Sequence, residues 1–306
     1  MPNNLRTDPT RTGMLRRAMM AEMVRRFAAV YKEIYKFVVT DDTFALEELP
    51  EKKALRKQGL HILQRQRYLF MTNPQKIESF EKWLTNVVDA NILAIEPGTG
   101  DPWTSRYIYN GYRQGVTRAY SDTNKASLAV TPDYYAGSRD QFLRSAFGQP
   151  EILQKLKILG TRAFNQLKGI TAQMSQEISR VLVEGMAAGQ NPLKIARGMK
   201  RVVNKISRIR ARRIARTEII YAHAEGQLDA FDMLGVDEVG VMAEWSTAGD
   251  DFVCVHCLDM EGKRFKVEDA HNEIPLHPNC RCAWIPYIPP KKKRPLRQRV
   301  SAVSFG

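Results

Sequence analysis

All four cysteines of the chain lie in one stretch, CVHCLDMEGKRFKVEDAHNEIPLHPNCRC, which covers residues 254–282. Cys254 and Cys257 form a C-x-x-C pair at its start, and Cys280 and Cys282 form a C-x-C pair at its end. A tight turn brings the sulfurs of a C-x-x-C pair together. Alternation along an extended segment puts both sulfurs of a C-x-C pair on one face. The stretch therefore predicts a small loop closed at both ends by thiol pairs, which constrains how this part of the chain folds.

Zinc is the first interpretation of these thiols, because four thiolates are the simplest closed tetrahedral set for a structural zinc ion. The predicted ligands are Cys254, Cys257, Cys280 and Cys282. His277 lies three residues before Cys280 and is a substitute ligand for either member of the second pair. His256 and His271 are less easily placed as ligands.

Three alternatives for the thiols stay open. A redox function requires a C-x-x-C pair at the N-terminus of a helix in a βαβ unit, whereas this pair is expected between strands. Disulfides require an oxidising compartment, and the absence of a recognisable secretion signal indicates folding in the cytoplasm. The third alternative is unligated thiols that act as small apolar residues.

A nuclease is an alternative function for the same stretch. EDAHNEIPLHPNCRC resembles a treble-clef His-Asn-His nuclease in its acid-then-histidine segment, its proline and its cysteine pairs. In that chemistry one histidine acts as general base on water, and a metal ion holds the scissile phosphate. The pattern lacks the helix with a second metal-binding histidine, because AWIPYIPP and a charged tail follow Cys282.

Apolar residues recur at helical spacing along most of the chain. Helices are expected at about 11–39, 51–71, 73–94, 103–122, 150–169, 170–190, 191–204 and 206–235. Asn73-Pro74 and Asn191-Pro192 are helix-start signals, Gly189 is a candidate C-cap, and Gly235 is expected to close the last helix. Strands are expected at 239–247 and 283–288, on either side of the cysteine stretch.

These elements predict a mainly α protein with a small C-terminal β-hairpin module (α+β). Residues 1–120 are expected to form a helical N-terminal domain, and 121–149 a linker or extended connection without clear periodicity. Residues 150–290 hold the next helices and the Cys/His-rich hairpin, and 291–306 form a disordered basic tail. A hairpin this small buries too little apolar surface to be stable alone, so a bound metal would stiffen it.

The chain carries a formal net charge of +14. Residues 193–216 contain ten Lys and Arg and no acid, and 291–300 contain six and no acid. Each run alone is also typical of a solvated helix face or a disordered end, but together they favour contact with phosphates. The predicted contacts are Lys200, Arg201, Lys205, Arg208, Arg210, Arg212, Lys291, Lys292, Lys293 and Arg294. Phosphate contacts carry no base specificity, so the expected partner is double-stranded DNA bound non-specifically.

Three segments resemble one known family. They are RIARTEIIYAHAEG (213–226), EWSTAGDDFVCVHCLDMEGKRF (244–265) and PLHPNCRC (275–282). Their order and spacing are similar to the phage head morphogenesis, or minor capsid, proteins of the Mu F and SPP1 gp7 type. The resemblance covers roughly residues 150–290.

The resemblance implies a minor component of a tailed-phage head, located in the virion and assembled in the host cytoplasm. It implies binding to the portal protein and to the major capsid or scaffold of a prohead, contact with packaged DNA, and no catalytic activity. The alternatives are a metal-dependent endonuclease at the packaging site and a basic nucleic-acid-binding protein unrelated to phage. No membrane partner is expected, because no stretch reaches the roughly 18 apolar residues that a membrane span needs.

Several polar residues in the matching segments are expected to be structural. Glu218 is expected to pair with Arg213 or Arg216, or to reach the hairpin. Packing between helix and hairpin is the expected role of Tyr221, His223 and Trp245. Asp250 and Asp251 are expected to shape the turn into Cys254 by bonding to nearby amides.

Overall fold

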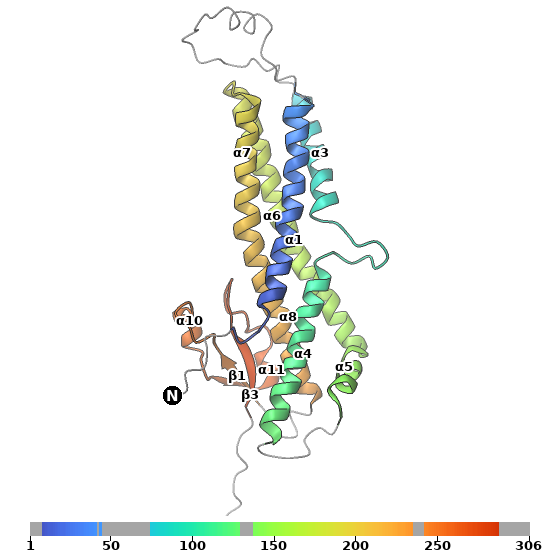
Figure 1. Cartoon of the computed structure of the whole chain (residues 1–306), viewed down its shortest axis with the longest axis vertical. Coiled ribbons are helices and arrows are strands. Elements are labelled where there is room, and N and C mark those ends of the chain that lie inside the picture. The colour runs from blue at the N-terminus through green and yellow to red at the C-terminus, as the bar shows by residue number, and fades with distance from the viewer. Residues whose placement is uncertain (1–7, 42, 45–73, 129–136, 235–241, 288–306) are drawn as a thin grey trace, which may run out of the picture.

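The protein is an elongated bundle of long helices with a small β-module against one side of its lower half (Figure 1). This computed structural model describes residues 8–41, 43–44, 74–128, 137–234 and 242–287. The mainly α fold with a small β-module is confirmed. The expected helix at 51–71, Gly235 and the tail at 291–306, with Lys291, Lys292, Lys293 and Arg294, lie outside the described residues.

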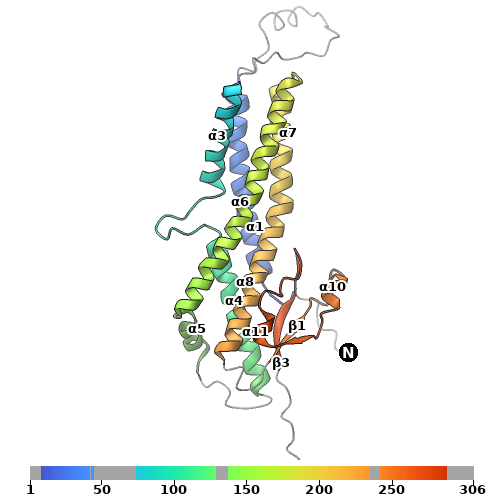
Figure 2. The same ribbon diagram turned by 180° about the vertical axis from the view of Figure 1, so that it is seen from behind.

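Two very long helical segments form the frame of the bundle. Helix α6 (Pro150–Ala187) runs along most of the length of the molecule, and α7 (Pro192–Lys205), η2 (Ile206–Arg210) and α8 (Ala211–Met233) return beside it (Figure 2). The turn between them was readable from the sequence. Gly189 adopts a φ of 59°, and the side chain of Asn191 caps α7 by accepting a 2.8 Å hydrogen bond from the Leu193 amide.

The upper half of the bundle adds α1 (Gly13–Tyr35), its π-helical extension η1 (Lys36–Thr40) and α3 (Pro74–Asn91) to this frame. The apolar stripe of α1 is buried there, as are the predicted apolar positions of α6. These buried α6 residues are Ile170, Met174, Ile178, Leu182 and Met186. Regular three- and four-residue spacing places such side chains on one helix face, so their common burial follows from the sequence.

The lower half packs α4 (Ser105–Leu128) directly against α8. The backbones approach so closely that a Cβ on Gly115 would lie 2.1 Å from the carbonyl oxygen of His223. A Cβ on Gly226 would lie 2.4 Å from the carbonyl oxygen of Tyr112. Only glycine permits this crossing, and both α4 and α8 then contact β3 of the β-module.

The expectation of an extended connection at 121–149 is wrong for the described part of that stretch, which is largely helical, whereas its role as a linker between domains stays a prediction. Helix α4 continues to Leu128, and α5 occupies Arg139–Phe147. A capping box starts α5, since Ser138 Oγ accepts from the Gln141 amide at 3.2 Å and Gln141 Oε1 accepts from the Ser138 amide at 2.9 Å. Phe142 and Ala146 then bury the apolar face of this short helix.

The predicted division at residue 120 remains a prediction, but helices from both sides of it share both hydrophobic cores. The upper core combines α1 and α3 with α6 and α7, and the lower core combines α4 with α6, α8 and the β-module. Within the described residues, no helix has the length and apolar character needed to cross a membrane.

The β-module is an antiparallel sheet in the order β2-β1-β3. Strands β1 (Met242–Ser246) and β3 (Ala283–Tyr287) are the predicted pair, and β2 (Arg264–Phe265) adds a short third strand. Trp245 lies opposite Trp284 in the β1–β3 register, and both side chains are buried with ring centroids 5.3 Å apart. This aromatic pair forms the small core on which the cysteine stretch is built.

Candidate metal centre

The β-module is fastened to α8 by a buried glutamine. Gln227 accepts a 3.1 Å hydrogen bond from the Trp284 amide and donates a 2.7 Å hydrogen bond to the Trp284 carbonyl oxygen. One side chain therefore satisfies both backbone groups of a residue at the start of β3. This contact sets the position of β3, and hence of the C-x-C pair that precedes it.

The turn before Cys254 is built around Asp250. Its carboxylate accepts a 3.0 Å hydrogen bond from the Phe252 amide, which is the turn-shaping role that the sequence predicted. Its second role was not predictable from the sequence. Arg281, between the two cysteines of the C-x-C pair, binds both oxygens of Asp250, with Nη1 2.6 Å from Oδ2. This two-point ion pair holds the two thiol pairs together.

The C-x-x-C pair starts one turn of helix, α10 (Val255–Leu258). Cys254 is its N-cap, and the Cys254 sulfur accepts a 3.4 Å hydrogen bond from the Cys257 amide. The sequence predicted that this pair lies between strands, whereas the pair lies at the start of a helical turn. The helix is a single turn, and the strands of the sheet around it are antiparallel rather than part of a βαβ unit.

The structure brings all four thiols and His277 together. His277 Nε2 lies 3.1 Å from both Cys254 Sγ and Cys257 Sγ, and Cys257 Sγ lies 3.8 Å from Cys280 Sγ. Two overlapping groups of three metal-ligating atoms result, Cys254–Cys257–His277 and Cys257–Cys280–Cys282. Zn–S bonds of about 2.3 Å in a tetrahedron place two sulfurs about 3.8 Å apart, so this spacing suits zinc.

A small cavity and the orientation of His277 both fit a bound ion. The cavity between these residues has a volume of about 20 Å³ and is lined by all four cysteines and His277. His277 Nδ1 lies 2.8 Å from the Pro278 carbonyl oxygen and donates to it, because that oxygen only accepts. The lone pair of Nε2 is therefore directed at the thiols, as in a histidine that binds a metal and is oriented by a backbone carbonyl.

The thiols influence each other's protonation. Hydrogen bonding from Cys282 lowers the pKa of the Cys280 thiol to about 5. Burial, with the charge of Cys280, raises the pKa of Cys257 to about 12. The hydrogen bond with Cys280, followed by burial, raises the pKa of Cys282. Cys280 is therefore the thiol of these three that ionises first, and a divalent cation would favour ionisation of Cys257 and Cys282.

A second polar cluster lies between the helices and the loop after α11 (Val267–Ala270). Buried Glu225 on α8 accepts from His271 Nδ1 at 2.8 Å and from the Asn272 amide at 3.0 Å. Lys155 of α6 lies 2.9 Å from Glu225 and 2.8 Å from Asp229. His271 is therefore part of an ion-pair network away from the thiols, which agrees with its poor placement as a ligand.

The sequence could have signalled this network. Glu225 and Asp229 are acids four residues apart on a helix whose neighbouring residues are mostly apolar, and buried acids need partners. Asp229, Asp232 and His271 also form a third group of metal-ligating atoms. The Asp229 carboxylate already forms an ion pair with Lys155 and accepts a 2.5 Å hydrogen bond from the Tyr112 hydroxyl at Oδ2.

Residues 176–285 match the family model of phage Mu protein F like proteins. The match covers less than half of the chain, but it includes α7, α8, all but the last two residues of the β-module and all five candidate ligands. The chain carries a Mu F-like region. This finding confirms the resemblance to a phage head morphogenesis family. No curated protein and no solved structure matches the chain.

Within the Mu F-like region, the predicted partner of Glu218 was wrong. Glu218 is buried on α8, and its nearest cation is Arg162 of α6, with Nε 3.4 Å from Oε2. Burial raises the pKa of Glu218. Arg162 also lies over the Tyr221 ring at 3.8 Å. Whether Glu218 pairs with Arg213 or Arg216 of its own helix, or with a cation of another helix, depends on how α8 packs. The spacing of residues along α8 does not reveal this packing.

The packing roles predicted for Tyr221 and Trp245 agree with their surroundings. The Tyr221 hydroxyl donates to the Asn272 side chain, and Trp245 lies in the core of the module. His223 is a packing residue too, but it is buried against α4 rather than against the hairpin. Burial lowers its pKa to about 3, which keeps the ring neutral.

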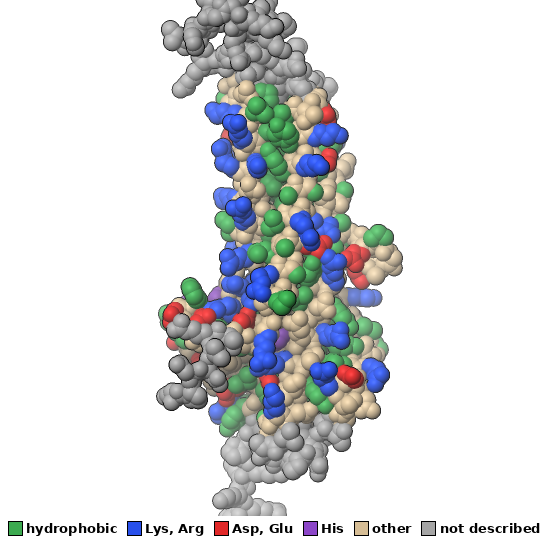
Figure 3. Space-filling view, viewed as in Figure 1, with side chains coloured by type: hydrophobic (Ala, Val, Ile, Leu, Met, Phe, Trp, Pro, Cys, Tyr) green, Lys and Arg blue, Asp and Glu red, His purple; other side chains and the backbone are tan. Residues whose placement is uncertain are grey.

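The predicted DNA contacts of the Mu F-like region follow α7, η2 and the start of α8. Lys200, Arg201, Lys205, Arg208 and Arg212 are exposed, and Arg210 is half-buried and donates to the Gln173 side chain. Figure 3 shows Lys and Arg side chains along the whole described length of the helical body. Contact of these residues with DNA remains a prediction.

Proposed function

We propose that this protein is a minor component of a tailed-phage head that binds the portal of the prohead and contacts the packaged DNA. The observation that supports this most directly is the Mu F-like match across residues 176–285, since that family acts in head morphogenesis. The net charge of +14 suits a protein that works beside densely packed DNA.

The thiol cluster is proposed to hold one structural zinc ion. Its four ligands would come from the two overlapping groups, Cys254–Cys257–His277 and Cys257–Cys280–Cys282. Such a closed set leaves no open position for water or substrate, so the metal would stabilise the module rather than catalyse a reaction. A non-enzymatic role agrees with the structural character of the family.

Co-sedimentation with proheads tests the proposal. The protein is co-expressed with the head genes of its phage, with and without the portal gene, and particles are separated on a gradient. We expect it to travel with proheads only when the portal is present. Protein that stays free in both cases would contradict head assembly, and a divalent-metal-dependent plasmid-nicking assay with His271→Ala and His277→Ala variants would then test the nuclease alternative.

A further inference from the structure

A wide cleft of about 770 Å³ lies between the start of α1, α4 and α5, outside the Mu F-like region. Its lining is rich in cations and poor in acids. The charged residues that line it are Arg11, Arg113, Arg118, Lys125, Arg139, Asp122 and Asp140. In Figure 3, several Lys and Arg side chains lie over the lower part of the molecule, where α4 and α5 are found.

Both acids of the cleft are neutralised by their own neighbours. Asp122 forms an ion pair with Arg118 one turn earlier on α4. Asp140, in the first turn of α5, lies 3.7 Å from Arg139 Nε. The net charge of the cleft is therefore set by its remaining cations.

Three cations of the cleft are exposed, and no acid among the described residues pairs with them. They are Arg11, Arg113 and Lys125. Arg11 lies in a turn closed by a 3.0 Å hydrogen bond from its amide to the Asp8 carbonyl oxygen, so the α1 wall is ordered. Arg113 and Lys125 are twelve residues apart on α4, or about 18 Å along the helix axis.

The chemistry of this lining fits phosphodiesters better than a protein surface. The amide side chains of Asn110 and Gln114 lie beside the cations in the cleft. Arg, Lys, Asn and Gln are typical contacts to DNA phosphates. The centre of a protein–protein interface is, in contrast, depleted of charged residues. A row of cations about 18 Å long suits a polyanion rather than a single small anion.

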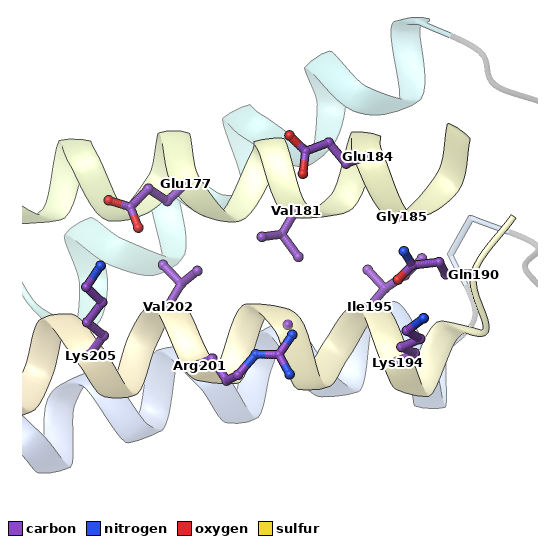
Figure 4. Close-up of a pocket in the computed structure, with 11 residues that line it drawn as sticks. Glu177, Val181, Glu184, Gly185, Gln190, Lys194, Ile195, Arg201, Val202 and Lys205 are labelled. Carbon is purple, nitrogen blue, oxygen red and sulfur yellow. The ribbon is translucent and has the colours of Figure 1, made fainter. Parts of the chain in front are cut away.

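The basic run of α7, η2 and the start of α8, called the α7 run below, is a weaker candidate because acids oppose part of it. Lys194, Arg201 and Lys205 line a groove of about 320 Å³ between α6 and α7. Figure 4 shows Glu177 and Glu184 on the α6 wall of this groove, opposite the three cations. These carboxylates reduce the local positive potential that would attract a phosphate backbone.

We propose that the α1–α4–α5 cleft binds the phosphate backbone of duplex DNA, with Arg11, Arg113 and Lys125 as its principal contacts. The inference rests on the DNA contact in the proposed function and gives that contact a location. Binding is independent of base sequence, because cations and amides in the cleft meet phosphates rather than base edges.

Salt-dependent binding of a duplex of mixed sequence tests the cleft. One variant carries Arg11→Gln, Arg113→Gln and Lys125→Gln. A matched variant carries Arg201→Gln, Arg208→Gln and Arg212→Gln, which removes the same charge from the α7 run. For the full-length chain, we expect the cleft variant to lower the slope of log Kobs against log salt by about 2 to 3, since each phosphate contact contributes about 0.9. The matched variant is expected to change the slope by less than about 1.

Each other outcome has a distinct meaning. Equal decreases of the slope in the two variants would show a response to net charge alone. A larger decrease in the matched variant would assign DNA binding to the α7 run. Either result would contradict DNA binding in the cleft. Displacement of DNA by inorganic phosphate, beyond that caused by chloride at equal ionic strength, would assign the cleft to free phosphate. A parent protein without DNA affinity would contradict the DNA contact in the proposed function itself, whereas prohead co-sedimentation tests assembly independently.

Discussion

Cys257 is the residue that both groups of candidate ligands share. Its sulfur faces His277 on one side and Cys280 on the other, at 3.1 Å and 3.8 Å. The other cysteines each belong to one group. Position in space therefore makes Cys257 the ligand that no neighbour can replace, although its place in the C-x-x-C pair is equivalent to that of Cys254.

We predict that the protein purifies with about one zinc ion per chain and that Cys257→Ser abolishes binding. His256→Asn is the matched control, because His256 is exposed on α10 and belongs to neither group of ligands. Zinc release by a thiol-reactive reagent, read with a chromogenic chelator, measures the content. Metal retained by Cys257→Ser, or none in the parent protein, would contradict the assignment.

The pair of His271 and Glu225 predicts a pH-dependent stability. Glu225 raises the pKa of His271 above its usual 6.5, against the effect of Lys155 and with the help of Asp229. The protonated imidazole therefore stabilises the fold below pH 6.5, and this contribution is lost as the pH rises through the raised pKa. Bonding to His271 and Lys155 lowers the pKa of Glu225 to about 2, so its contribution is lost only as the pH falls from 4.5 toward 2.

His271→Gln should cost about 1.5 to 3 kcal/mol in mildly acidic solution, because it removes a hydrogen bond to a buried carboxylate. The stability difference between parent and variant should shrink as the pH rises to about 9, where the imidazole is neutral. Chemical unfolding of both proteins at matched zinc loading measures this difference, and metal effects common to both cancel. A difference that stays constant with pH would rule out this ion pair as a source of stability.

At the scale of elements, the helices follow local sequence signals, whereas their crossings do not. The apolar stripes, Asn191 and Gly189 indicated where helices lie and end. The Ser138–Gln141 capping box was also readable, but the polar composition of 121–149 concealed the short α5 that it starts. Gly115 and Gly226 carried no local signal, since their importance comes from the backbone of another helix.

Gly115→Ala and Gly226→Ala should each destabilise the protein by about 3 kcal/mol or more, because the added methyl group meets a rigid helix carbonyl. Gly169→Ala is the internal control. Gly169 is exposed in α6 with nothing within 4 Å of a Cβ, so alanine should stabilise by about 0.5 to 1 kcal/mol through helix propensity. Thermal unfolding of the three variants checks the contrast. Similar effects at all three positions would argue against the close α4–α8 crossing.

At the scale of the whole molecule, the described residues form two hydrophobic cores, one above the other along the bundle. The cysteine cluster belongs to the lower core with Trp245 and Trp284, whereas the upper core contains no residue of the β-module. Loss of the metal should therefore loosen one end of the molecule before the other.

Cys254→Ser should increase the susceptibility of residues 242–287 to proteolysis and leave the upper bundle of α1, α3, α6 and α7 protected. The reason is that a small sheet depends on its cross-link, whereas the long helices bury their own apolar stripes. Limited proteolysis with hydrogen exchange, in the parent protein with and without a chelator, measures this. Unchanged protection of 242–287 in the variant would contradict a stabilising role for the cluster, and global unfolding would contradict the independence of the upper core.

The sequence by itself determined the helical stripes, their caps, the two strand segments and the C-x-x-C and C-x-C pairs, because each of these features depends on residues that are close together in the chain. It also contained the family motifs. Only the tertiary structure decided that Glu225 meets His271, that Gln227 holds β3, that Glu218 faces Arg162, and that Arg11, Arg113 and Lys125 share one cleft. These contacts join residues far apart in the chain, and their distances depend on how whole helices cross rather than on any local pattern.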